Sequence, residues 1–192
     1  MKRILSLVLV VMLICSLAVL GAACGKKEGE QGTAKQLKLY FVNQKYVETG
    51  EEADGVLVPY DGISITLPTE PAEGATDKDA EAFGYTAAIS NLWQVPQDLK
   101  GAATVVNEDL ELHNISCRDG VAYVDIDGGS LEKLGGSTQE EILIGQIVET
   151  LINSFDEIQK VQFLVDGKET DSLLGHVDTS EPFDSGMLSI AK

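Results

Sequence analysis

The sequence predicts an α+β fold: a single compact domain whose mixed β-sheet carries two helices on one face, in the order β-β-α-β-β-α-β. Short apolar runs bounded by turn residues predict the five strands. Two segments, 77–95 and 137–155, change to the helical spacing of apolar residues. Placing both helices on one face of the sheet lets every element bury its apolar side in a common core.

The first two strands are predicted on either side of a polar, acidic segment at 44–55. The run QLKLYFVN at 36–43 is short, apolar and aromatic, which is typical of a strand. The run VLVPYDGISITL at 56–67 predicts one or two strands, broken at Pro59 and at an Asp61-Gly62 turn.

The first helix is predicted over 77–95, with acidic residues in its first turn and Pro96 just after its end. Its apolar residues recur at helical spacing: Ala80, Phe83, Ala87, Ala88 and Leu92. We expect Trp93 to anchor the core or its rim rather than to hold a ligand.

A β-hairpin is predicted where EDLELHNISC and VAYVDI flank RDG, with Ala122, Val124 and Ile126 facing one side. In the second helix, Ser137 and Glu140 fit a capping box, in which each side chain satisfies a free amide at the helix start. The apolar stripe of this helix follows at i, i+3, i+4 spacing: Ile144, Ile147, Val148, Leu151, Ile152 and Phe155.

The last strand is predicted at 161–166, VQFLVD, and its residues Val161, Phe163 and Val165 would face the core. A turn follows at Asp166-Gly167, and then His176, Asp178 and Ser180 fall within five residues. These three residue types occur in hydrolase triads, but a triad depends on placement in space and not on closeness in sequence. We expect 176–183 to fold back over the sheet edge or to present a contact surface, with His176 in a structural role.

The N-terminus carries the pattern of a secretory signal peptide at 1–23. A basic start at Lys2 and Arg3 precedes an apolar run from Ile4 to Leu20, small residues and Cys24. The small residues before the cysteine are typical of a bacterial lipoprotein signal, in which Cys24 becomes the first mature residue and carries the lipid, such as palmitate. The alternative is an uncleaved anchor, because about 20 apolar residues can span a bilayer. Both interpretations place the rest of the chain outside the membrane.

The remaining chain divides into a polar tether at 24–36, a domain at 37–183 and a tail at 184–192. Of the three cysteines, Cys15 lies in the leader and Cys24 is the lipid site, so no disulfide within the mature chain is expected. Cys117 is expected to be a small core residue. The formal net charge of −17 repels nucleic acid and anionic lipid head groups, so no nucleic-acid partner is expected.

A family resemblance rests on five stretches: LKLYFV, CRDGVAYVDI, GGSTQEEILIGQIVETL, KVQFLVDGKETDSL and GHVDTSEPF. Their order resembles a GerMN domain, the sporulation and spore germination domain of bacterial lipoproteins, over roughly residues 37–183. The resemblance implies a non-enzymatic, extracytoplasmic module of sporulation, germination or envelope assembly in Gram-positive bacteria. It supplies no catalytic residue.

The residues themselves predict no catalytic site, cofactor or metal. The run DIDGGSLEKLGG begins like a calcium loop at Asp125 and Asp127, but it has Gly129 and Gly136 where oxygen ligands should stand. Candidate binding residues lie at the turn after the last strand and in the tail beyond it: Asp166, Gly167, Lys168, His176, Asp178 and Phe183.

The leading functional hypothesis is a binding or assembly module at the outer face of the cytoplasmic membrane, tethered through Cys24. Its partner would be an envelope protein or the cell wall, with weak self-association a further option. Two alternatives stay open. One is a receptor lipoprotein for a small solute or a wall fragment, and the other is a hydrolase centred on His176.

Overall fold

The computed structural model describes residues 32–68 and 76–191. Its strands are β1 (Gly32–Asn43), β2 (Leu57–Pro68), β3 (Ala102–Ala103), β4 (Leu112–Arg118), β5 (Val121–Ile126), β6 (Lys160–Val165) and β7 (Lys168–Glu169). Its helices are α2 (Gln44–Thr49), the 3-10 turn η1 (Glu52–Asp54), α3 (Asp77–Ser90), α4 (Gly128–Leu131) and α5 (Ser137–Ser154). The α+β class is confirmed, and the long elements follow the predicted order.

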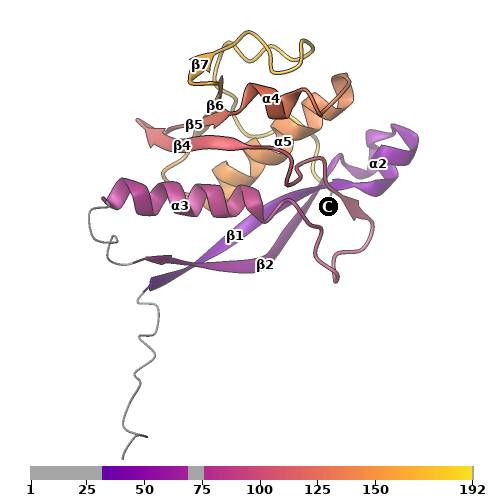
Figure 1. Ribbon diagram of the computed structural model, residues 1–192. Helices are drawn as coiled ribbons and strands as arrows, with labels where there is room; N and C mark the ends of the chain where they lie inside the picture. Colours follow the sequence, from indigo (N-terminus) through magenta and orange to yellow (C-terminus); the bar gives the residue numbers. More distant parts are fainter. Residues whose placement is uncertain (1–31, 69–75, 192) are drawn as a thin grey trace, which may run out of the picture. The chain divides into compact units, whose positions relative to one another are not determined.

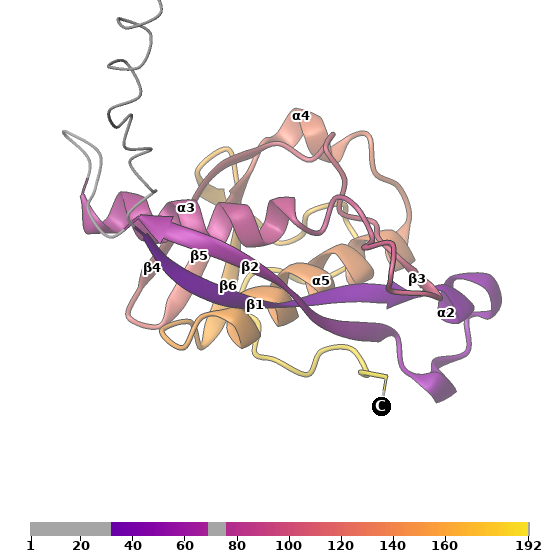
Figure 2. The same ribbon diagram turned by 90° about the horizontal axis from the view of Figure 1, so that it is seen from below.

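The strands form two sheets, which differs from the one mixed sheet of the prediction. One sheet has the order β2-β1-β3 and is antiparallel; the other has the order β4-β5-β6-β7, in which β5 and β6 are parallel. Figures 1 and 2 show α3 and α5 lying between the β1–β2 hairpin and the strands β4, β5 and β6. The two sheets therefore share the helices instead of joining edge to edge.

Helix α5 keeps the sheets apart because its side chains hydrogen-bond to an edge of β1. The hydroxyl of Ser154 accepts a hydrogen bond from the Lys38 amide (3.0 Å) and donates one to the Lys38 carbonyl (3.2 Å). The hydroxyl of Thr150 accepts from the Tyr40 amide (3.1 Å). Four helical residues rise about 6 Å, and two strand residues rise about 6.6 Å, so the two repeats match.

Gln146 continues this row one helical turn earlier and joins β1 to the chain that leads from β3. Its side-chain amide donates to the Tyr40 carbonyl (2.9 Å), and its carbonyl oxygen accepts from the Val105 amide (3.0 Å). The side chain is fully buried. Each polar atom that this amide takes out of water thus has a partner, which burial requires.

Strand β2 is continuous through Asp61-Gly62, where the sequence predicted a turn. Leu37 pairs with Ile63 and Leu39 pairs with Tyr60, so Asp61 and Gly62 form a β-bulge opposite one residue of β1. A Cβ on Gly62 would collide with the ring of Tyr60. A larger residue at position 62 would therefore require the Tyr60 ring to move.

Strand β1 also begins earlier than predicted. Residues 32–36, predicted as part of the tether, pair with residues 64–68 of β2 and so belong to the hairpin. The signal peptide at 1–23 and the tether before Gly32 lie outside the described residues. Among the helices that the structure describes, none combines the length and the apolar character needed to cross a bilayer.

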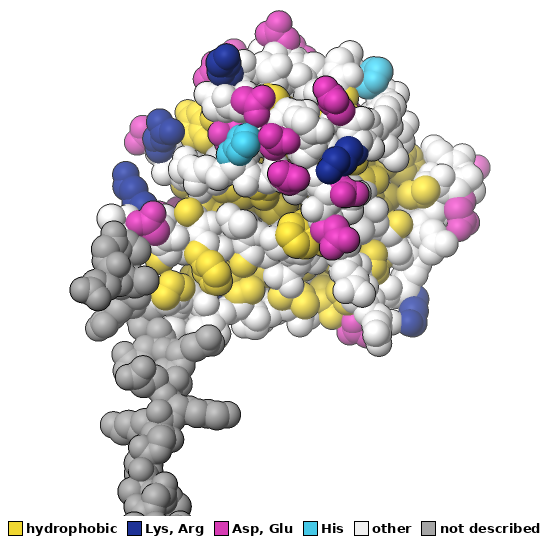
Figure 3. Space-filling model, in the orientation of Figure 1, with side chains coloured by type: hydrophobic (Ala, Val, Ile, Leu, Met, Phe, Trp, Pro, Cys, Tyr) yellow, Lys and Arg dark blue, Asp and Glu magenta, His cyan; other side chains and the backbone are white. Residues whose placement is uncertain are grey.

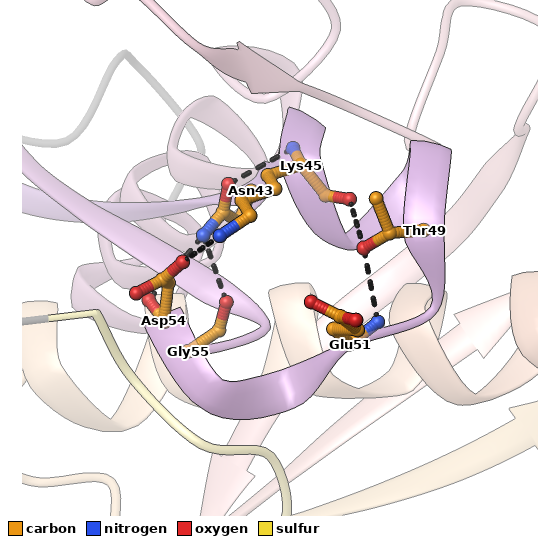
Figure 4. Close-up of polar contacts among 6 residues, drawn as sticks. All are labelled: Asn43, Lys45, Thr49, Glu51, Asp54 and Gly55. Carbon is orange, nitrogen blue, oxygen red and sulfur yellow. Dashed lines mark hydrogen bonds and ion pairs between the residues drawn. The ribbon is translucent and has the colours of Figure 1, made fainter.

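The acidic segment between β1 and β2 folds into α2 and η1 around Asn43 (Figure 4). The Asn43 side chain accepts from the Lys45 amide (3.0 Å) and donates to the Gly55 carbonyl (2.9 Å). Lys45 forms an ion pair with Asp54. The side chain of Asn43 thus caps the start of α2 and also binds the end of the segment at Gly55.

Helix α3 ends at Ser90, five residues earlier than predicted, and its buried face is rotated. Phe83, expected in the core, is 53% exposed, whereas Tyr85 is buried. The Tyr85 ring packs edge-on against Phe155 at 4.8 Å, and its hydroxyl donates to Glu157 (2.9 Å). Gly84 lets the helix approach Leu67, because a Cβ there would fall 2.8 Å from that side chain.

The apolar stripe of α5 is confirmed. Ile144, Ile147, Val148 and Leu151 are fully buried, Phe155 is nearly so, and Ile152 is half-buried. The capping box is wrong: Gly136 precedes the helix with no side-chain cap, and Glu140 is completely buried. Its carboxylate instead accepts hydrogen bonds from backbone amides within residues 173–176.

Two Asp-Gly pairs make the tight turns of the second sheet. Asp119-Gly120 joins β4 to β5 and Asp166-Gly167 joins β6 to β7, with positive φ at all four residues, as a two-residue hairpin turn requires. The register then sets Leu112 beside Ile126, and Ile126 beside Val165. Residues 113, 127 and 166 therefore meet at one end of the sheet.

Candidate functional site

The chain after β7 forms an irregular layer, here called the C-terminal segment (residues 170–191), in which the structure describes no helix or strand. Phe183 exchanges two backbone hydrogen bonds with Val161 of β6, at 3.0 and 2.8 Å. Its ring lies edge-on to Phe163, with the ring centres 5.9 Å apart. The prediction that 176–183 folds back over the sheet edge is thus confirmed.

Glu140 of α5 fixes the first half of this segment. One carboxylate oxygen accepts from the Ser172 hydroxyl (2.8 Å) and from the Leu173 and Leu174 amides (3.0 and 2.9 Å). The other oxygen accepts from the His176 amide (2.9 Å). A loop of consecutive amides wrapped around an anion is a backbone nest, here filled by a side chain of the same protein.

The charge of Glu140 is compatible with its burial because of these donors. Burial by itself raises the pKa of the carboxyl group, but the Leu174 amide, the Ser172 hydroxyl and the His176 amide stabilise the charged form more strongly. The pKa of Glu140 therefore lies below its ordinary value. The carboxylate is the anionic partner of the segment at neutral pH.

Glu149, more than two turns further along α5, fixes the second half in the same way. It is fully buried, and it accepts from the Ser185 hydroxyl (2.7 Å), the Gly186 amide and the Asn153 side chain (3.1 Å). Two carboxylates on one helix thus hold the C-terminal segment at both ends, while Thr179 between them is buried and His176 and Asp178 are exposed.

His176, Asp178 and Ser180 do not assemble into a catalytic triad. Asp178 accepts from both the Ser180 amide (3.0 Å) and the Ser180 hydroxyl (2.6 Å), which is a local turn contact. His176 contributes its backbone amide to Glu140, and in the described part of the chain no hydrogen bond joins its ring to Asp178 or Ser180. Phe183 packs on the core.

Asp166, in the turn between β6 and β7, belongs to a different cluster of side chains. Its Oδ1 accepts from the Gly128 amide (3.1 Å) and lies 3.1 Å from His113 Nε2. Asp127 Oδ1 is 3.7 Å from the same nitrogen, and Asp125 accepts from the Gly167 amide (2.8 Å). Figure 3 shows acidic side chains gathered around a histidine on this face of the domain.

These contacts shift two pKa values in opposite directions. The hydrogen bond from the Gly128 amide is the main reason that the pKa of Asp166 lies below its usual range, and the hydrogen bond with His113 is the next. The hydrogen bond to Asp166 raises the pKa of His113, and Asp125 and Asp127 add to this effect. The ligand atoms of His113, Asp127 and Asp166 all lie within 4.8 Å of one another, so these residues could hold a cation. Their own ion pairs and backbone donors account for the arrangement.

Sequence reasoning missed Glu140 and His113 for different reasons. Glu140 follows Ser137 at the spacing of a capping box, and its distant partners are backbone amides, which leave no sequence signal. His113 joins Asp166 only through the register of β4, β5 and β6. The alignment of the strand ends could have indicated this group, since each of the three residues adjoins a strand terminus or lies one residue inside it.

We expect Glu140→Gln to destabilise the protein by about 2 kcal/mol at neutral pH, because the neutral amide bonds more weakly and turns a donor toward amide donors. Urea unfolding measures this difference. A carboxyl group whose pKa is lower in the folded than in the unfolded protein stabilises the fold at pH values above its unfolded-state pKa. This stabilisation is lost as the pH falls through the folded-state pKa. The stability difference between wild type and Glu140→Gln should therefore shrink below pH 4.5, the ordinary pKa of glutamate. Glu141→Gln on the adjacent, half-exposed residue is the control. Equal stability of the two variants would contradict the role of Glu140.

We expect the His113 ring to titrate above the ordinary histidine value of 6.5, and this pKa to fall in Asp166→Asn. NMR of the ring protons measures both. Because the pKa of His113 is higher in the folded than in the unfolded protein, any stabilisation by its charge is fully present below the unfolded-state pKa. It disappears as the pH rises through the folded-state pKa. Asp178→Asn, which changes a carboxylate outside the group, should leave the pKa of His113 unchanged. An unaltered pKa in Asp166→Asn would contradict the assignment.

The chain matches the model of the Germane family, described as sporulation and spore germination, over residues 38–171. No curated protein matches the chain. The matched range runs from β1 through β7 and contains α3, α5 and the Asp166 turn. The C-terminal segment lies beyond it, apart from its first two residues.

Solved structures with a similar arrangement have low identity. A candidate lipoprotein from Clostridium perfringens is 20% identical, with a TM-score of 0.48 over 82% of this chain and 90% of that one. The tandem GerMN domains of the sporulation protein GerM from Bacillus subtilis give 17% and 0.49, over 78% of this chain and 45% of that one. The first GerMN domain of GerM alone gives 19% and 0.46, over 78% and 96%.

The match to the family model spans well over half of the chain. The resemblance found in the sequence is thereby confirmed. The chain belongs to the Germane family of sporulation and spore germination, and residues 38–171 form its GerMN-type domain.

Proposed function

We propose that this chain is a non-enzymatic binding and assembly module of sporulation, spore germination or envelope assembly in a Gram-positive bacterium. It would be held at the outer face of the cytoplasmic membrane by a lipid on Cys24. The family match over 38–171 is the observation that carries this proposal, because the family is one of sporulation and germination proteins and is not known for an enzymatic activity. The leader ending at Cys24 supports the location.

The C-terminal segment and the turn before it are the surface that we assign to the partner. Lys168, His176 and Asp178 are exposed, while the backbone that carries the two tail residues is held by buried Glu140 and by Thr179. A surface fixed before binding loses little conformational entropy when a partner docks. The partner would be an envelope protein or the wall, and a second copy of this chain is a weaker option.

Two other functions differ in their support. A hydrolase centred on His176 is disfavoured by the local contact of Asp178 with Ser180, which engages the carboxylate away from the imidazole. A receptor for a small solute or a wall fragment is favoured by one observation, the cleft beside Trp93.

We expect the full chain, expressed in a Gram-positive host, to incorporate a labelled fatty acid at Cys24. Metabolic labelling followed by membrane fractionation measures this. Cys24→Ala should abolish the label and leave the leader uncleaved, because the modified thiol no longer exists. Cys15→Ala, within the apolar run, is the matched control and should keep the label. A label that persists in Cys24→Ala would rule out this attachment site.

Affinity capture from membranes of the native host, during growth and during sporulation, tests the partner surface. We expect a partner to co-purify with the wild type, and Lys168→Glu combined with His176→Ala to weaken its binding about tenfold, the equivalent of about 1.4 kcal/mol. Lys78→Glu makes the same charge change on α3, outside this surface, and should keep the partner.

Two results would contradict the proposal. One is equal capture by the surface variant and by the control. The other is a hydrolytic activity of the purified wild type that His176→Ala abolishes while the partner still binds. Sedimentation of the purified chain at rising concentration separates a foreign partner from self-association.

A further inference from the structure

A cleft on the domain lies beside Trp93, away from the C-terminal segment in sequence. It measures about 690 Å³ and adjoins a second hollow of about 320 Å³ that shares three of its lining residues, Ser90, Trp93 and Glu108. Each hollow by itself falls within the size range of small-ligand sites. Hydrophobic side chains gather on the face drawn in Figure 3, below the acidic group.

Both walls of the cleft are anchored in the core. After the end of α3, Leu92 is fully buried, and its neighbour Trp93 is left 40% exposed at the rim. The facing wall, the chain entering β4, is held by buried Val106 and Leu110, and Leu110 donates to the Asn107 carbonyl (3.1 Å). Trp93 is thus an exposed aromatic on a fixed backbone and not a core anchor.

The polar lining consists mainly of neutral groups that both donate and accept hydrogen bonds. The lining side chains of this kind are Ser90, Asn91, Gln94, Gln97 and Asn107. Asn91 uses its amide nitrogen on the Ala87 carbonyl, and Asn107 uses its amide oxygen on the Asp109 amide. Among the residues that the structure describes, no hydrogen bond engages the other polar atom of either side chain, so each can serve a ligand, and Glu108 adds a carboxylate acceptor.

The charge of the lining restricts the class of ligand. Of the described residues that line the two hollows, none is Lys, Arg or His, whereas Glu108 and Glu111 are acidic. Phosphates, nucleotides and carboxylates would therefore meet acceptors and negative charge in place of cationic donors. A ligand with many neutral hydroxyl or amide groups suits the amide side chains instead.

We propose that this cleft binds a short, uncharged saccharide, with one sugar ring packed on the face of Trp93. The C–H groups of a pyranose ring carry partial positive charge and pack on the electron-rich indole face. Its hydroxyl groups both donate and accept, as do the side chains of Gln94, Gln97 and Asn107. The inference goes beyond the proposed assembly role and does not depend on the partner surface.

The chain contains a single tryptophan, so its fluorescence reports directly on this cleft. The probes are the N-acetylglucosamine tetramer and the maltose-series tetramer as two neutral saccharides, with inorganic phosphate and a glucuronate oligomer as anions. We expect a saturable change in tryptophan emission with at least one neutral saccharide at micromolar to millimolar concentration, and none with the anions.

Calorimetry with the saccharide that binds then tests the named residues. Gln97→Ala should weaken binding roughly tenfold, as the loss of one good hydrogen bond does, and Trp93→Ala should weaken it more. Phe83→Ala removes an exposed aromatic side chain of α3 that does not line the cleft, and this variant should bind as the wild type does. Melting temperatures of all three variants check that the fold is kept.

Three results would overturn the proposal. The first is no emission change with either neutral saccharide, and the second is binding that Trp93→Ala leaves intact. The third is binding of the anions or of a peptide in preference to the sugars, which would assign the cleft to another ligand class. None of these results bears on the capture experiment, because Lys168 and His176 are not lining residues of the cleft.

Discussion

The fold depends on the buried polar face of α5. An ordinary amphipathic helix turns its polar residues to water, but α5 buries Glu140, Gln146, Glu149, Thr150 and Ser154 together with its apolar stripe. Each of these side chains is hydrogen-bonded, mostly to backbone groups of segments far away in the sequence. Such an arrangement tolerates no partial loss, since a buried group left without its partner costs free energy.

The five side chains serve two different neighbours. Thr150, Ser154 and Gln146 hydrogen-bond to the edge of β1, where a neighbouring strand would otherwise pair. The carboxylates of Glu140 and Glu149 hydrogen-bond to the C-terminal segment. An unpaired strand edge is an attractive site for pairing with another chain. By covering this edge with a helix, the domain closes one such site, and β1 stays in a small sheet of its own beside β2.

The fold class and the order of elements could be predicted because they depend on periodicity. The change from strand alternation to helical spacing, and the Asp-Gly pairs that need positive φ, are visible in single segments. The number of sheets could not be predicted. Thr150 and Ser154 fall on what a helical wheel shows as the solvent side, and nothing in the sequence distinguishes a hydroxyl bonded to β1 from one bonded to water.

The candidate site divides along the same line. The turn at Asp166-Gly167 and the return of Phe183 to the sheet were predicted from local patterns. The meeting of His113 with Asp166 depends on strand register, and the burial of Glu140 depends on a nest of amides formed by a loop without regular structure. The exposure of Trp93 depends on where α3 ends, and helix ends are the least certain part of a pattern. Phe83 shows the same difficulty, because a shift of two residues around the helix exchanged it for Tyr85.

The early start of β1 sets how far the domain could stand from the bilayer. If Cys24 carries the lipid, only eight peptide steps separate it from Gly32, where the hairpin with Pro68 begins. A fully extended chain of that length spans at most about 28 Å. The open end of the hairpin would then stay within that distance of the lipid anchor, and a longer linker would be needed for the domain to reach further from the membrane.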